Sequence, residues 1–180
     1  MPLIEDVEPS ALRLGSARDL GAMTVIPIEG SNKYQLVSKE RLGAILCMWE
    51  PSVFKGDGTE ARKTIVFEIP SDVQQKVEQI EEAIRKSLQL SSRVAWNSSL
   101  KDNTMRAKIR MTAPKACTYV SINGEPVHQP EAWRHLEVIP VLELKSVYKQ
   151  PTMAGLVWEC IALMVGECRK DDVVLEYDFV

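Results

Sequence analysis

Strict alternation of apolar and basic residues over residues 105–111 constrains the fold more than any other run in this chain. The run reads Met-Arg-Ala-Lys-Ile-Arg-Met. Because successive side chains of a β-strand point to opposite faces, this period of two predicts a half-buried strand. The apolar residues would face a core. Arg106, Lys108 and Arg110 would form a basic row on the other face, with neighbours about 6.6 Å apart.

The basic row has two interpretations. In the first, it lines a groove that follows the phosphates of a single nucleic-acid strand, and Lys101 before it and Lys115 after it extend the positive track. In the second, it is a solvated strand face whose cations serve solubility or protect a sheet edge. The segment taken alone favours the second interpretation, because any basic strand has this pattern. The rest of the chain shifts the balance towards the first.

Composition limits what the chain can be. With 180 residues, of which 45% are hydrophobic, the chain can bury one good core and is expected to form one globular unit. The formal net charge of −3 means that any nucleic-acid site has to be a local patch. No apolar run is long enough to span a bilayer, so no membrane partner is expected.

Motifs of metal binding and catalysis are missing from the sequence. The cysteines form no CxxC pair and have no histidine at ligand spacing, and no P-loop, dinucleotide-binding glycine run, HExxH or GxSxG occurs. We therefore expect neither an enzyme nor a cofactor. Because the cysteines lie in apolar runs and no signal peptide is evident, we expect a reducing intracellular location: cytoplasm, nucleus or, for a viral chain, the virus replication site. The four are Cys47, Cys117, Cys160 and Cys168.

One amphipathic helix is predicted over about residues 72–88. Ser71 and Gln74 fit a capping box, and an apolar stripe recurs at steps of three or four residues. The opposite face is expected to be solvated, because it carries two pairs of opposite charge four residues apart. These pairs are Glu81 with Arg85 and Glu82 with Lys86. We expect the helix to be a scaffold that covers one side of a sheet.

The remaining pattern predicts a mainly β fold, with roughly eight strands joined in hairpins. We expect an OB-like β-barrel of Greek-key type with one inserted helix, with a β-sandwich as the alternative. The expected organisation is an irregular N-terminal arm over residues 1–20, a single OB-like domain over 21–166, and an acidic C-terminal segment with terminal aromatic residues over 167–180. The alternating pattern of that last segment fits a closing strand as well as a tail.

Aromatic residues near the basic row are candidate surfaces for base stacking. Trp96 lies in a polar stretch before the basic strand, whereas Trp133 and Tyr148 lie in or near basic contexts. Trp158 lies inside the apolar last strand and is expected in the core. The cations beside Trp133 and Tyr148 are Arg134, Lys145 and Lys149.

The order of these features resembles a known family. A Ser- and Asn-containing stretch with Trp96 leads to the basic strand. It is followed by a hairpin, by the segment Ile-Pro-Val-Leu-Glu-Leu-Lys-Ser-Val-Tyr ending at Tyr148, and by a strand that begins at Gly155. Over about residues 64–166, this pattern is similar to the OB-fold single-stranded DNA-binding proteins of large DNA viruses and of some phages. The resemblance implies an OB barrel, binding without sequence preference, and a role in DNA replication or recombination.

The sequence thus predicts a protein that binds single-stranded nucleic acid, with DNA favoured over RNA. The basic row would bind phosphates, Trp96 with Trp133 or Tyr148 would stack on bases, and four lysines would widen the positive groove: Lys101, Lys115, Lys145 and Lys149. The C-terminal segment would contact replication proteins, and self-association is left open. Two alternatives remain: a viral coat or scaffold protein with a β-sandwich, and a β-rich protein-interaction module.

Overall fold

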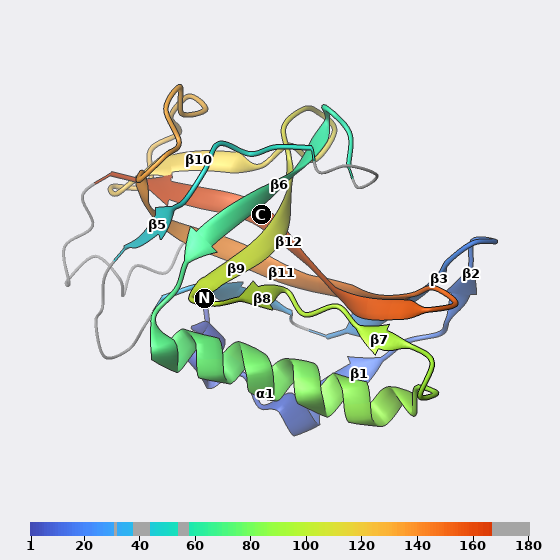
Figure 1. Cartoon of the computed structure of the whole chain (residues 1–180). Helices are drawn as coiled ribbons and strands as arrows, with labels where there is room; N and C mark the ends of the chain where they lie inside the picture. Colours follow the sequence, from blue (N-terminus) through green and yellow to red (C-terminus); the bar gives the residue numbers. More distant parts are fainter. Residues whose placement is uncertain (31, 38–43, 54–57, 167–180) are drawn as a thin grey trace.

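A closed ring of strands forms the centre of the molecule (Figure 1). The computed structural model describes residues 1–30, 32–37, 44–53 and 58–166. The ring runs β11-β5-β6-β9-β12 and returns to β11, and its neighbours are antiparallel except for the parallel pair β9 and β12. This closure confirms the OB-like barrel expected from the sequence. The ring strands are β5 (Ile45–Cys47), β6 (Arg62–Glu68), β9 (Thr104–Arg110), β11 (Glu137–Lys149) and β12 (Met153–Val165).

Short strands extend the ring on its outside. β3 pairs with the second half of β11, and these strands continue with β12 into a ribbon that projects to the right in Figure 1. β10 lies parallel to the end of β12. The sheet has 12 strands, more than the sequence pattern indicates, because several are too short to show a period. The short strands are β1 (Arg13–Leu14), β2 (Arg18–Asp19), β3 (Thr24–Glu29), β4 (Lys33–Gln35), β7 (Ala95–Trp96), β8 (Leu100–Lys101) and β10 (Thr118–Ser121).

A single helix, α1 (Ser71–Leu88), lies below the barrel in Figure 1, and its apolar stripe is buried as predicted. The predicted capping box is wrong. Pro70 is the N-cap residue and no side chain caps the first turn, since Ser71 already belongs to the helix. The predicted solvated face is also wrong at one position. Glu82 pairs with Arg85 and Lys86 on the outside, but Glu81 is only 5% exposed and faces the barrel.

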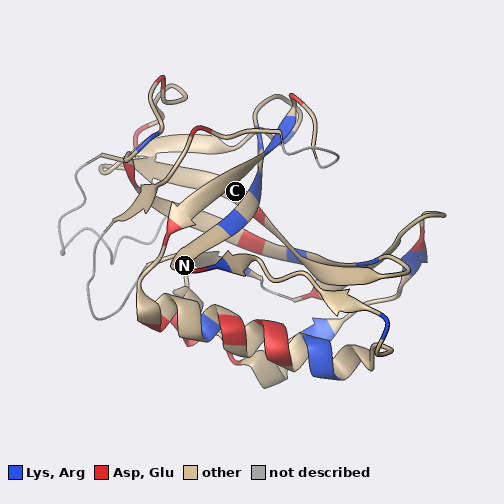
Figure 2. Cartoon of the chain, viewed as in Figure 1, with Lys and Arg blue, Asp and Glu red and all other residues tan. Residues whose placement is uncertain are grey.

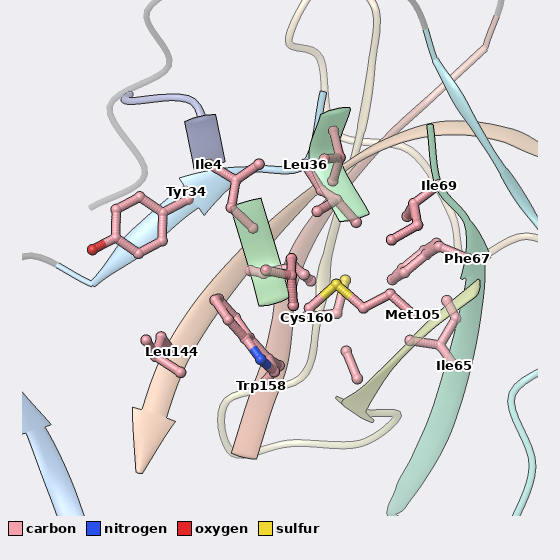
Figure 3. Close-up of a cluster of buried hydrophobic side chains, with 14 of the residues drawn as sticks. Ile4, Tyr34, Leu36, Ile65, Phe67, Ile69, Met105, Leu144, Trp158 and Cys160 are labelled. Carbon is pink, nitrogen blue, oxygen red and sulfur yellow. The ribbon is translucent and has the colours of Figure 1, made fainter. Parts of the chain in front are cut away.

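The core fills the barrel and the space between the barrel and α1. The inner rows of β6 and β9 contribute Phe67 and Met105, and β12 contributes Trp158 and Cys160 (Figure 3). Trp158 is 1% exposed, which confirms its predicted place in the core. Burial of these side chains is the main stabilising contribution, at about 25 cal/mol for each Å² of apolar surface removed from water.

Residues 1–20 do not form an irregular arm. Two 3₁₀ turns, η1 (Ile4–Asp6) and η2 (Pro9–Ala11), precede β1 and β2, and both strands pair with β3. Ile4 and Val7 are buried at 0% and 4% exposure, and the Lys76 ammonium on α1 donates a hydrogen bond to the Val7 carbonyl at 3.1 Å. Sparse apolar residues in such turns leave no periodic signal. The predicted C-terminal segment 167–180 lies outside the described residues.

Candidate nucleic-acid interface

The basic row lies on the outer face of the barrel. Along β9 the apolar residues are buried, while Arg106, Lys108 and Arg110 are half-buried on the opposite face. In the antiparallel register with β6, Arg62 lies opposite Arg110 and Thr64 lies opposite Lys108, so these β6 residues share the outer face. Blue segments along β9 and at the upper end of β6 mark these cations in Figure 2.

A buried carboxylate lies among these cations. Glu159 on β12 is aligned with Lys108 of β9 and is 3% exposed. Its carboxylate accepts hydrogen bonds from Lys145 Nζ at 2.6 Å and Arg110 Nε at 2.9 Å, and Arg62 lies 3.8 Å away. We call the six residues of this cluster the basic face. They are Arg62, Arg106, Lys108, Arg110, Lys145 and Glu159.

Burial and ion pairing act on Glu159 in opposite directions. Burial by itself raises the pKa of this carboxyl group, whereas its contacts with Lys145 and Arg110 and the charge of Arg62 lower it, and the net result is a pKa below its ordinary value. Glu159 therefore stays ionised at neutral pH. Its partners keep a third or more of their side-chain surface in water: 34% for Arg62 and 37% each for Arg110 and Lys145. The cluster has one internal counterion and spare cationic surface.

The other cations of the basic row also have partners inside the protein. The Arg106 guanidinium donates to the Ser98 carbonyl at 2.7 Å and to Asn97 Oδ1 at 3.4 Å. Lys108 Nζ donates to the Thr64 hydroxyl at 3.1 Å. The row is thus an ordered set of side chains, held in place by neutral and acidic acceptors.

Tyr148 joins the basic face through the same network. Its hydroxyl accepts a hydrogen bond from the Asn97 side-chain amide at 2.7 Å. Tyr148 lies opposite Gly155 on β12, where a Cβ atom would come within 2.6 Å of the Asn97 carbonyl oxygen and 2.9 Å of the Tyr148 hydroxyl. Glycine is therefore needed here, because only a residue without Cβ lets the Tyr148 side chain lie across the strand.

The other predicted lysines are exposed. Lys101 on β8 lies opposite Thr104, in line with the outer row of β9. Lys115 lies in the loop after β9 with a φ of 67°, and Lys149 ends β11. Of the four lysines predicted to widen the groove, only Lys145 contacts the cluster around Glu159.

Two of the predicted stacking residues do not lie on this face. Trp133 is 3% exposed and packs edge-to-face against Tyr119, with ring centroids 6.0 Å apart, so it has no open ring face. Trp96 donates its indole N–H to Glu81 at 3.1 Å and packs against the core. Because adjacent strand residues face opposite sides, Trp96 points towards α1 while Asn97 points towards the basic face. Trp133 and Trp96 therefore form part of the packing.

Sequence reasoning missed Arg62, Asn97 and Glu159. Glu159 had a signal, since it is the sole charged residue in the apolar run 154–166. A charge in a strand that is otherwise buried needs partners, and opposite charges on neighbouring strands are the usual ones. Arg62 and Asn97 had no such signal, because their roles depend on strand register.

Across the described ranges, no helix is long and apolar enough to cross a membrane. The same residues contain no group of three or more His, Cys, Asp or Glu side chains that could hold a metal ion.

Comparison with known proteins gives a structural match only. No family model and no curated protein sequence matches the chain. The fold is similar to that of a phage single-stranded DNA-binding protein. The structure of the single-stranded DNA-binding protein from bacteriophage Enc34 in complex with ssDNA matches with a TM-score of 0.52 and 13% identity, covering 87% of this chain and 97% of that chain. Its C-terminal truncation matches with a TM-score of 0.53 and 15% identity, covering 87% and 96%. The predicted resemblance in fold is confirmed.

Proposed function

We propose that this protein binds single-stranded DNA through the basic face, without strong sequence preference. The observation that carries the proposal is the position of the cations. Arg62 and the basic row lie on the outer surface of β6 and β9, the second and third strands of the ring in chain order, and OB folds use this surface for oligonucleotides. The Enc34 protein, similar in fold, was solved with ssDNA bound.

The geometry supports phosphate binding and not base reading. Residues of the basic row repeat at about 6.6 Å, and their partly exposed cationic groups can replace the counterions of a polyanionic backbone. Tyr148, half-buried beside Arg106 and Asn97, would offer an aromatic edge to a base. Arg and Lys on an open strand face contact phosphates of any sequence. Weak sequence preference and a role in DNA replication or recombination follow from this proposal.

The experiment replaces Arg106, Lys108 and Arg110 together with Ala and measures binding to oligo-dT over a range of salt concentrations. Each lost phosphate contact on a single strand flattens the plot of log K against log salt by about 0.7, so the slope should fall by about 2 and the affinity should drop. A control variant replaces Arg85, Lys86 and Arg93, which are exposed on or after α1, and so changes the net charge equally.

Circular dichroism verifies that both variants are folded, and the single variant Lys108→Ala provides a milder version of the same test. An unchanged slope in the folded triple variant, or an equal loss in the control, would contradict the site assignment. Duplex DNA and single-stranded RNA serve as competitors, because the proposal expects single-stranded DNA to compete best.

The closed barrel bears on the two alternatives. A coat or scaffold role was tied to a β-sandwich, and the closed ring of β11, β5, β6, β9 and β12 removes that argument. A protein-interaction module would show no mobility shift with any oligonucleotide at low salt. Contact with replication proteins through residues 167–180 stays a prediction, because that segment lies outside the described residues.

A further inference from the structure

Trp49 stands apart from the other aromatic residues. It is 51% exposed, and every other aromatic side chain in the described part of the chain is buried or half-buried. It packs against neither hydrophobic cluster of the molecule. Its ring instead lies under the Arg134 guanidinium, whose central carbon is 5.2 Å from the ring centroid, and Arg134 is itself exposed. An indole this open to water has no role in holding the core together.

The backbone places Trp49 beside the basic face. The Met48 amide donates to the Val66 carbonyl of β6 at 2.9 Å, and Ser52 and Thr64 exchange two backbone hydrogen bonds of 3.0 and 2.8 Å. Residues 48–52 therefore lie along β6 on the side away from β9. Two strand spacings, about 10 Å, separate this segment from Lys108 on β9.

We propose that Trp49 and Arg134 form a base-stacking site that continues the DNA track of the basic face across β6. This inference rests on the proposed function and adds a second contact point to it. A nucleotide base would stack on the ring face opposite Arg134, and spare N–H groups of Arg134 would bind the flanking phosphate. The separation of about 10 Å fits one strand, since an OB fold covers about 4–16 nucleotides.

The arrangement suits this role for two physical reasons. The Arg134 guanidinium covers one face of the Trp49 ring and limits its rotation, so less conformational freedom is lost when a base binds the other face. Val53 on the same segment is 41% exposed, which adds apolar surface beside the ring. Stacking would remove both from water.

The four tryptophans differ enough in exposure to make a selective test. Trp133 and Trp158 are 3% and 1% exposed, and Trp96 is half-buried and bonded to Glu81. Quenching of intrinsic fluorescence by oligo-dT should therefore come mainly from Trp49. Trp49→Leu should abolish most of this quenching and weaken binding about 5- to 150-fold, which is the range for one stacked base, about 1–3 kcal/mol.

Conservative variants separate stacking from a general loss of surface. Trp49→Tyr should restore most of the affinity because it keeps an aromatic face, and Trp96→Phe should leave both the affinity and most of the quenching unchanged. Arg134→Ala should weaken binding less than Trp49→Leu and flatten the salt slope by about 0.7. Because Trp49 lies outside the core, all of these Trp49 and Arg134 variants should unfold at the wild-type urea concentration.

The outcomes distinguish this inference from the proposed function. If Trp49→Leu binds oligo-dT as wild type does, or the quenching persists in it, the stacking site is refuted while the basic face stands on its own salt-slope test. If wild-type protein shows no binding to oligo-dT at low salt, the proposed function and this inference both fail.

Discussion

Replacing Glu159 with Gln should destabilise the fold and strengthen DNA binding at the same time. The Glu159 carboxylate is 3% exposed and has three cations around it, at 2.6, 2.9 and 3.8 Å. Gln has nearly the same shape but no charge, and its amide nitrogen cannot accept a hydrogen bond. One of the two bonded cations, Lys145 or Arg110, would therefore lose its acceptor and turn towards solvent.

The size of the destabilisation follows from these contacts. A hydrogen bond between charged groups contributes about 1.5–3 kcal/mol, and a fully buried ion pair that loses one partner costs about 3–5 kcal/mol. Arg110 and Lys145 keep 37% of their side-chain surface in water, so they can be rehydrated and the lower range applies. We expect the free energy of unfolding to fall by about 1–3 kcal/mol. For DNA, one released cation should steepen the salt slope by about 0.7.

Urea unfolding followed by circular dichroism measures the first effect, and salt titration of oligo-dT binding measures the second. Glu143→Gln is the matched control. Glu143 lies directly opposite Glu159 on β11, is half-buried, and forms no ion pair with any described residue. It removes the same charge without releasing a cation. Equal effects of the two substitutions on stability and on slope would refute the reasoning, because overall charge would then explain both.

Two further predictions concern the same face. Because the pKa of Glu159 is lower in the folded protein than in the unfolded chain, its ionised form stabilises the fold above the unfolded value of about 4.3, and this contribution is lost as the pH falls through the lower folded value. Wild type should therefore lose more stability than Glu159→Gln in urea unfolding between about pH 5 and pH 2, and parallel curves would contradict this. Gly155→Ala places a methyl group 2.6 Å from the Asn97 carbonyl oxygen. It should lower stability by about 1–3 kcal/mol, seen as a lower melting temperature, and weaken oligo-dT binding by displacing Tyr148; an unchanged melting temperature would contradict the argument.

Local patterns in the sequence were sufficient where neighbours along the chain decide the structure. The alternation over residues 105–111 predicted β9 and the face of its cations, because strand geometry alone assigns adjacent residues to opposite faces. The stripe of α1 was predicted for the same reason. That stripe also contained an overlooked signal. Glu81 is four residues after Val77 and three before Ile84, both buried, so its angular position already lay on the buried side.

Strand register decided the rest, and register is not visible in a single sequence. Arg110 and Glu159 are separated by 49 residues, and only the parallel pairing of β9 with β12 brings them together. Trp133 was predicted to stack on bases because Arg134 follows it. The fold buries Trp133 against Tyr119 and leaves Arg134 over Trp49 instead. A neighbouring cation in sequence does not determine which aromatic ring it covers in space.

The internal partners of the basic face explain how a chain of net charge −3 can present a site for a polyanion. Arg106, Lys108 and Arg110 are held by the Ser98 carbonyl, the Thr64 hydroxyl and the Glu159 carboxylate, so little side-chain freedom is left to lose when a phosphate arrives. Exposed lysines such as Lys115 would still lose that freedom, at about 0.5–1.5 kcal/mol for each side chain. Ordered cations therefore contribute more to affinity per charge than exposed ones. Glu159 reduces the total charge of the face, and in return it fixes the positions of the cations on which the proposed binding depends.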